Sequence, residues 1–142
     1  MPEHATLVTF SGKGVLLRGR SGCGKSDLAF RLIENCKAKL VADDVVDIYA
    51  ENNVVFGKVC NNLEGLLEVR GIGIAKYDYE PATAICLVVD LVKDENSVER
   101  LPVAEYTELA GIKVPCIKLV GFYGSAEQKI LLKLRDNLLK TD

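Results

Sequence analysis

The chain has 142 residues, 49% of them hydrophobic and 27% charged, which is enough for one domain with a sizeable core. Its net charge of −2 provides no field of one sign that would attract nucleic acid or anionic lipid, so we predict no nucleic-acid partner. The apolar runs are far shorter than the roughly 20 residues of a membrane-spanning helix, and the N-terminus lacks the pattern of a secretory signal, so we predict no membrane partner.

The number and spacing of the cysteines indicate the redox state of the compartment in which the protein acts. Their number, five, is odd, and no two of them have the C-x-x-C spacing. This argues against a disulfide framework and against a zinc site. Because reduced thiols are typical of cytosolic proteins, we expect a cytoplasmic location.

The first predicted elements are a β-hairpin and a helix. Apolar residues at 7–10 and 15–17 flank a Ser-Gly-Lys-Gly turn, which predicts two strands joined by a tight turn. Residues 27–34 have Leu28 and Leu32 at helical spacing, which predicts a helix with one apolar face.

Between the hairpin and the helix lies a glycine-rich segment that fits the pattern G-x-x-x-x-G-K-[ST] of a phosphate-binding loop, or P-loop. We call it the 19–26 loop, and its residues are Gly19, Arg20, Ser21, Gly22, Cys23, Gly24, Lys25 and Ser26. The glycines permit a turn whose N–H groups can face one anion, and the start of the helix adds the positive end of its dipole. Lys25 would reach the β- and γ-phosphates of a nucleoside triphosphate, and the Ser26 hydroxyl would ligate Mg²⁺. The alternative is a chance glycine-rich turn.

Two adjacent carboxylates interrupt the next apolar strand, which is predicted at 39–46. We expect this strand to run beside the one that leads into the 19–26 loop, which would bring Asp43 and Asp44 near the γ-phosphate. A carboxylate there can hold Mg²⁺, position a water or accept a hydroxyl proton. Because adjacent strand residues point to opposite faces, we expect only one of the two to act in the site. The alternative is a solvated strand end.

The middle of the chain predicts more strands. Residues 48–56 contain a Glu-Asn-Asn turn between apolar residues and predict a second hairpin, and residues 61–67 predict a short helix or a turn. Residues 68–74 predict one glycine-punctuated strand, on which Glu68 and Arg70 share a face. That pair could ligate a metal and neutralise charge beside a triphosphate, or it could form a cross-strand salt bridge.

Towards the C-terminus, residues 83–92 predict a strongly apolar strand and residues 93–100 a charged surface turn. Residues 106–120 predict one further short strand, in which Pro115 indicates an edge. Residues 127–140 have the clearest helical pattern in the chain.

These elements indicate an α/β fold with a strand-rich mixed sheet. Two long helical patterns accompany seven or eight strands, and the strands follow one another by tight turns rather than alternating with helices. We predict a single domain over residues 1–142, with a mixed or largely antiparallel sheet and without repeats or linkers. The role of the one histidine, His4, has two alternatives: a solvated side chain near the terminus, or a site residue anchored near the 19–26 loop.

Four segments together resemble the catalytic domain of HPr kinase/phosphorylase. They are His-Ala-Thr at 4–6, the 19–26 loop, Leu-Val-Ala-Asp-Asp at 40–44 and Glu-Val-Arg-Gly-Ile-Gly-Ile at 68–74. The last of these resembles the family's own motif, and it is more specific than a phosphate-binding loop. Gly-Ile-Lys-Val-Pro at 111–115 also resembles the family segment that leads to its final strand.

The resemblance implies a fold similar to that of phosphoenolpyruvate carboxykinase. It implies a serine kinase that uses ATP and Mg²⁺ and acts on HPr, the carrier protein of sugar phosphotransferase systems. It also implies removal of that phosphate by phosphorolysis, and a homo-oligomer that is commonly a hexamer.

Residue roles follow from the resemblance by position. Lys25 would bind phosphate, and Ser26 and Glu68 would bind Mg²⁺. Asp43 would be the general base toward the acceptor serine and the acid in the reverse direction. His4 would match the family's active-site histidine, and Arg70 would be a supporting charge.

The sequence departs from the family pattern in three places. The family's long N-terminal domain has no counterpart, so we expect a short form. Residues 75–81 replace a glycine-alanine-rich segment that ends in a site arginine, and residues 121–125 replace an arginine-proline-glycine-arginine stretch. Because both replaced segments are associated with phosphorylase action and HPr contact, kinase activity is better supported than phosphorylase activity. The alternatives are a nucleotide-sensing module without useful catalysis and a kinase with another acceptor.

Overall fold

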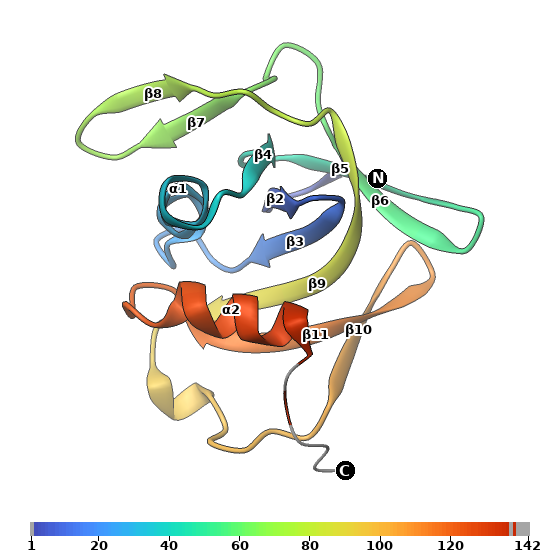
Figure 1. Cartoon of the computed structure of the whole chain (residues 1–142), viewed down its shortest axis with the longest axis vertical. Coiled ribbons are helices and arrows are strands. Elements are labelled where there is room, and N and C mark those ends of the chain that lie inside the picture. Colours follow the sequence, from blue (N-terminus) through green and yellow to red (C-terminus); the bar gives the residue numbers. More distant parts are fainter. Residues whose placement is uncertain (1, 137, 139–142) are drawn as a thin grey trace.

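The computed structural model describes residues 2–136 and 138, which form a strand-rich α/β fold (Figure 1). The helices are α1 (Lys25–Cys36) and α2 (Ala126–Arg135), with a 3-10 turn at Glu95–Ser97. The strands are β1 (Pro2–Glu3), β2 (Thr6–Phe10), β3 (Lys13–Arg18), β4 (Lys39–Ala42), β5 (Val46–Glu51), β6 (Val54–Val59), β7 (Leu66–Val69), β8 (Gly73–Lys76), β9 (Ala82–Val92), β10 (Glu105–Leu109) and β11 (Ile112–Val120).

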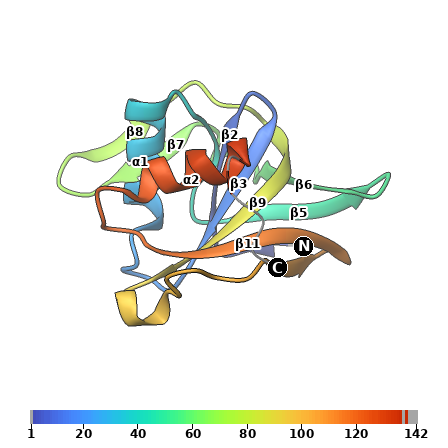
Figure 2. The ribbon, with the colours of Figure 1, turned by 60° about the horizontal axis from the view of Figure 1, so that its bottom comes forward.

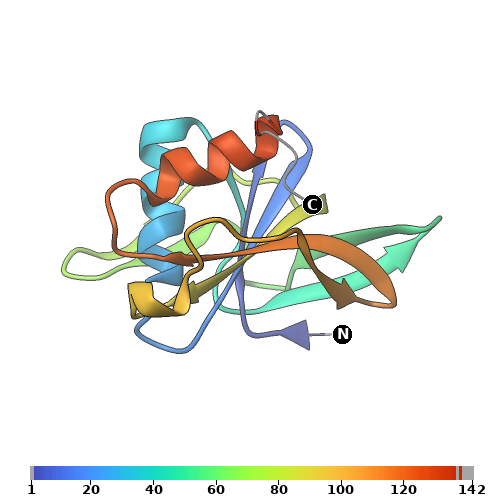
Figure 3. The ribbon, with the colours of Figure 1, turned by 90° about the horizontal axis from the view of Figure 1, so that it is seen from below.

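Most strands belong to one mixed sheet in which β1, β5, β6, β9, β3, β2 and β4 are neighbours in that order. Strand β9 is parallel to β3 on one side and to β11 on the other, whereas β2, β4, β5, β6 and β10 make antiparallel pairs. The first part of β9 pairs with β6 and the last part with β11, so the hairpins β5–β6 and β10–β11 fan out from one long strand (Figure 3). The predicted strand-rich mixed sheet is confirmed.

The central strands are buried on both faces because their side chains alternate between two apolar cores. On β3, Val15 and Leu17 face a core shared with Leu28, Leu32 and Ile130 of the two helices. Both helices therefore cover the same face of the sheet (Figure 2). Leu16 faces the second core, which the curled hairpins β5–β6 and β10–β11 close.

The structure corrects several sequence-based expectations. Strand β2 lies between β3 and β4, so β4 does not run beside the strand that precedes the 19–26 loop. Residues 68–74 do not form one strand, because a turn at 70–72 separates β7 from β8. Residues 61–65 form turns, which is one of the two forms predicted for residues 61–67, and β7 begins at Leu66.

Residues 106–120 likewise form a hairpin of two strands, β10 and β11. Pro115 lies one residue before the pairing of β11 with β9 begins, where its missing N–H costs no hydrogen bond to β9. Helix α2 ends at Arg135 rather than at 140, and of the predicted helix the residues 137, 139 and 140 lie outside the described part of the chain.

Candidate functional site

Strand direction brings the predicted site residues to one edge of the sheet. Strands β3, β9 and β11 are parallel, and β4 runs the same way because both β3 and β4 are antiparallel to β2. The segments that follow these strands are residues 19–24, 93–97, 121–125 and 43–45, and they meet at this edge. In open α/β sheets, ligands bind at the carboxyl ends of the strands.

The 19–26 loop connects β3 to α1 by a turn that depends on glycine. Gly24 has φ +91°, a left-handed conformation that side-chained residues rarely adopt, and α1 begins at the next residue. The Cys23 N–H donates to the Arg20 carbonyl at 3.0 Å, which closes the turn. The N-terminal N–H groups of α1 therefore face the loop, as in an anion site.

Lys25 is a buried cation without a carboxylate partner among the described residues. Only 8% of the residue is exposed, and its Nζ donates to the Gly19 carbonyl at 2.7 Å. A buried ammonium is costly unless an anion offsets its charge. The side chain of Lys25 is thus positioned for an anion bound in the 19–26 loop.

Asp43 joins three separate segments of the chain. Its Oδ1 accepts hydrogen bonds from Ser26 Oγ at 2.7 Å and from Thr6 Oγ1 at 3.0 Å, and its Oδ2 accepts from the Glu68 N–H at 3.3 Å. Thr6 is fully buried, so it holds the carboxylate from the core side. Sequence reasoning did not assign Thr6 a role of its own, although it stands in the same short segment as His4.

Asp44 points away from Ser26, so only one of the two carboxylates meets the loop, as expected. The predicted reason, alternation along a strand at 39–46, is wrong, because β4 ends at Ala42 and both aspartates lie in the bend after it. The Asp44 backbone is left-handed, with φ +72°, and its Oδ1 lies 3.5 Å from His4 Nε2. Both side chains of this pair are about two-thirds exposed or more, at 67% for His4 and 71% for Asp44. The structure therefore brings Asp43, and not Asp44, to Ser26.

Glu68 and Arg70 are not on one strand face. Glu68 lies on β7 beside Asp43, and Arg70 is exposed in the turn between β7 and β8. Within residues 2–136, neither Arg70 nor His4 makes a hydrogen bond or ion pair with the 19–26 loop. The expected shared face fails because a positive-φ turn at Gly71 reverses the chain there.

The oxygen donors of this edge suit a hard cation such as Mg²⁺. The Ser26 hydroxyl lies 2.7 Å from the Asp43 carboxylate, and Glu68 comes to this edge through its backbone N–H, which donates to the same carboxylate. The described residues contain no cluster of three or more His, Cys, Asp or Glu side chains that could hold a metal by themselves. Mg²⁺ in proteins is usually bound by one or two protein oxygens together with phosphate oxygens and waters.

The segment after β11, residues 121–125, lies against the 19–26 loop, a contact that the sequence analysis did not predict. A Cβ on Gly24 would lie 3.1 Å from the Phe122 ring, and a Cβ on Gly121 would lie 2.6 Å from the Cys23 carbonyl oxygen. From the segment after β9, Lys93 Nζ lies 3.9 Å from the position that a Cβ on Gly22 would take. The one sequence signal at this segment was its departure from the family pattern at residues 121–125, and the parallel direction of β3, β9 and β11 brings it to the loop.

Arg31 of α1 holds this segment in place. Its guanidinium donates to the carbonyls of Gly121 and Tyr123 and, at 2.9 Å, to Glu127 Oε1. Tyr123 in turn donates its hydroxyl to Glu95 Oε2 at 2.8 Å, and this bond raises the pKa of the Tyr123 phenol. The segments after β9 and β11 are thus tied to each other and to the helix that starts at the loop.

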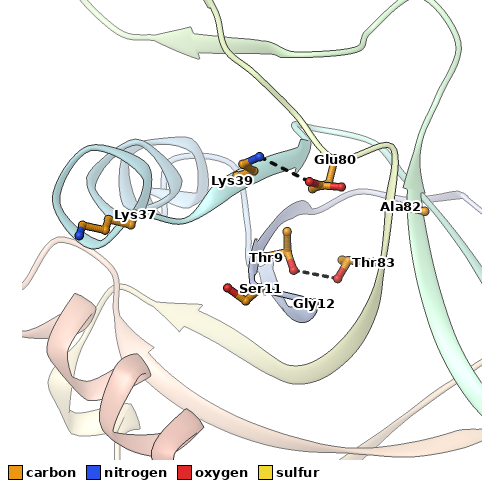
Figure 4. A pocket seen from close by; sticks show the side chains of 8 residues that line it. All are labelled: Thr9, Ser11, Gly12, Lys37, Lys39, Glu80, Ala82 and Thr83. Carbon is orange, nitrogen blue, oxygen red and sulfur yellow. Dashed lines mark hydrogen bonds and ion pairs between the residues drawn. The ribbon is translucent and has the colours of Figure 1, made fainter.

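A pocket of about 390 Å³ lies at the opposite end of the sheet, by the turn between β2 and β3 (Figure 4). Figure 4 shows Thr9 and Thr83 facing each other there, with Oγ1 atoms 2.8 Å apart, and Lys39 paired with Glu80. Thr83 also donates to the Ala84 carbonyl at 3.2 Å. Because these polar groups already satisfy one another and no predicted site residue lines the pocket, we place the candidate site at the carboxyl edge.

Comparisons with known proteins identify relatives. The family model described as the HPr serine kinase C-terminal domain matches residues 1–131. An HPr kinase/phosphorylase from Chlorobium phaeobacteroides is 37% identical over 133 residues, covering 85% of this chain and 41% of the relative. One from Streptococcus thermophilus is 35% identical over 127 residues, with coverages of 82% and 41%.

A solved structure has a similar fold. The HPr(Ser) kinase/phosphatase from Coxiella burnetii superposes with a TM-score of 0.81 at 28% identity, covering 96% of this chain and 89% of that chain. The predicted similarity to the fold of HPr kinases is confirmed. The chain spans about two fifths of the length of the two curated relatives, at 41% for each. In the described part of the chain, neither helix has the length and apolar character needed to cross a bilayer.

Proposed function

Because this chain belongs to the HPr serine kinase C-terminal domain family, we propose that it transfers the γ-phosphoryl group of ATP to a serine of HPr. The observation that carries this proposal is Lys25, a buried cation at the start of α1 whose only partner among the described residues is a backbone carbonyl. The homologues named HPr kinase/phosphorylase support the substrate. We also propose that residues 1–142 form one catalytic domain that acts in the cytoplasm as a homo-oligomer, and in particular as the hexamer that the family resemblance implies.

In this proposal, the 19–26 loop binds the phosphates through its N–H groups. Lys25 exchanges the Gly19 carbonyl for β- and γ-phosphate oxygens, so one hydrogen bond replaces another while the buried charge gains an anion. Ser26 and Glu68 hold Mg²⁺, which would neutralise charge on the phosphates. His4 and Arg70 stand further out, where they would meet the acceptor protein.

Asp43 acts as the general base. The acceptor serine gives its hydroxyl proton to the Asp43 carboxylate as its oxygen bonds to the γ-phosphorus, and the bond from that phosphorus to the bridging oxygen breaks to release ADP. The hydrogen bonds from Thr6 and Ser26 hold the carboxylate in one orientation beforehand. In the phosphorolytic direction, the protonated Asp43 would return the proton to the serine oxygen as phosphate attacks, giving pyrophosphate.

The test is incubation of the protein with HPr from the same organism and MgATP, followed by mass spectrometry of HPr. We expect one phosphoserine, absent with Lys25→Ala. Asp43→Asn should bind ATP but transfer at least about 100-fold more slowly, the usual contribution of a general base. The matched control is Asp44→Asn, which changes the neighbouring exposed carboxylate and should keep near wild-type transfer.

Different results would point elsewhere. If Asp44→Asn loses transfer and Asp43→Asn keeps it, the assignment of the base is wrong. If the wild type binds ATP but modifies neither HPr nor any other acceptor, the nucleotide-sensing module becomes the better reading. Pyrophosphate formed from phosphorylated HPr and phosphate would add the phosphorylase activity.

A further inference from the structure

Phe122 is an aromatic side chain left largely in solvent beside the 19–26 loop. It is 60% exposed, although a phenyl ring usually stabilises a fold by being buried. The atoms that approach Gly24 are those at the far end of the ring, Cζ and both Cε atoms. The ring therefore touches the loop with its tip and keeps much of its surface free.

The position of this ring is fixed by its neighbours. Arg31 donates to the carbonyls on either side of Phe122, those of Gly121 and Tyr123. Tyr123 is anchored to Glu95, and Gly121 packs closely on the carbonyl of Cys23. A ring placed in this way costs little further ordering when a ligand packs on it.

The topology places the ring beside the loop on the side of β3 that carries β9 and β11, opposite to the side of β4 and Asp43. Nucleotides lie at the carboxyl ends of parallel strands with their phosphates at a helix N-terminus. The phosphates would occupy the 19–26 loop after β3, so the base extends towards the segments after the neighbouring parallel strands β9 and β11. In the described structure, Phe122 is the exposed aromatic residue whose ring lies against the loop itself.

We propose that Phe122 is the base-stacking residue of this site, and that its ring packs on the flat face of a purine whose phosphates lie in the 19–26 loop. This inference rests on the proposed nucleotide-binding function and adds the subsite for the base. Stacking on an aromatic ring uses the π-face that every base has. The contribution of Phe122 is therefore similar for ATP and GTP.

The test compares a nucleotide with a ligand that has phosphates but no base. We would titrate Phe122→Ala with ATP, with GTP and with inorganic tripolyphosphate in the same Mg²⁺ buffer, by calorimetry. The expected result is a loss of roughly 5- to 150-fold in affinity for both nucleotides, the range that a base–aromatic stack of about 1–3 kcal/mol corresponds to. Tripolyphosphate affinity should change less than about 2-fold, and Phe122→Trp should restore nucleotide binding.

A matched control is Val54→Ala, which truncates another exposed apolar side chain, in the β5–β6 hairpin, and should change neither affinity. Equal weakening of ATP and tripolyphosphate would overturn the inference, because Phe122 would then act by shaping the loop. Unchanged ATP affinity would overturn it as well. A wild type that binds neither ligand would instead contradict the proposed function, and a wild type that binds tripolyphosphate as tightly as ATP would contradict only the base subsite.

Discussion

Replacing Arg31 by Met should destabilise the fold, because the buried carboxylate of Glu127 would lose its cationic partner. Arg31 is 19% exposed and Glu127 is 7% exposed, and the pair joins α1 to α2 at 2.9 Å. Without Arg31, Glu127 would keep only the hydrogen bond from Asn35 Nδ2, at 3.1 Å, among its described partners. Two carbonyls of the segment that carries Phe122 would also lose their donor.

The expected cost is about 3 kcal/mol. Removing one partner of a buried ion pair costs about 3–5 kcal/mol, and the remaining Asn35 bond favours the lower end of that range. An unfolding entropy of about 2.1 cal/mol/K per residue gives about 0.3 kcal/mol/K for this chain, so the midpoint of thermal unfolding should fall by about 10 °C.

Urea unfolding followed by circular dichroism measures this cost. Arg31→Met combined with Glu127→Leu should recover at least half of the lost free energy, because no unpaired charge then remains in the interface. The control is Asp27→Ala, which removes the exposed i, i+4 partner of Arg31 and should cost less than about 0.5 kcal/mol. A cost below about 1 kcal/mol for Arg31→Met, or an equal cost for Asp27→Ala, would refute the reasoning.

Three further predictions concern the interior of the sheet. Burial, and after it the hydrogen bond to Asp90, raises the pKa of the Cys116 thiol to about 12. Iodoacetamide at pH 8 should therefore alkylate Cys116 about 1,000-fold more slowly in the native chain than in the unfolded chain, as measured by peptide mass spectrometry. Burial would raise the pKa of the Asp90 carboxyl, but the hydrogen bonds from Arg18 and Cys116 outweigh it and hold that pKa below its usual value. The stabilisation by Asp90 is therefore complete above the unfolded pKa of about 3.9 and is lost as the pH falls through the folded pKa. In urea unfolding, the free energy of unfolding of Asp90→Asn should fall less between pH 6 and pH 3 than that of the wild type. Gly14→Ala should lower the free energy of unfolding by about 1–3 kcal/mol in the same assay, because the added Cβ would meet the Ala84 backbone carbonyl and lie 2.7 Å from Thr83 Cγ2. A change near zero would show that β3 and β9 can separate locally.

Local patterns predicted the elements that are close in sequence. The hairpin of β2 and β3, the glycine-rich turn after it and the helix α1 depend on neighbouring residues, and all three lie where expected. The residues 68–74 show where this reasoning fails. Alternating apolar residues and glycines fit both a strand and a tight hairpin. The chain forms the hairpin because Leu67 packs against α1 and Gly71 adopts a positive φ.

Pairings between distant segments could not be predicted from the same patterns. Periodicity does not indicate which strands are neighbours, so the insertion of β2 between β3 and β4 was missed. The contact of Arg31 with Glu127 joins residues that are 96 positions apart, and nothing in either local sequence indicates it.

Short segments of the sequence were enough to predict the family, the mixed strand-rich fold and the 19–26 loop with its lysine, because each of these predictions depends on residue types in short stretches of the chain. The contacts themselves come from the folded chain, in which Asp43 meets Ser26, Asp44 turns away to His4 and Phe122 lies against the loop. The physical reason is that side-chain direction at a strand end depends on the local backbone angle. The neighbours of a side chain depend on how segments far apart in the chain bury their shared apolar faces.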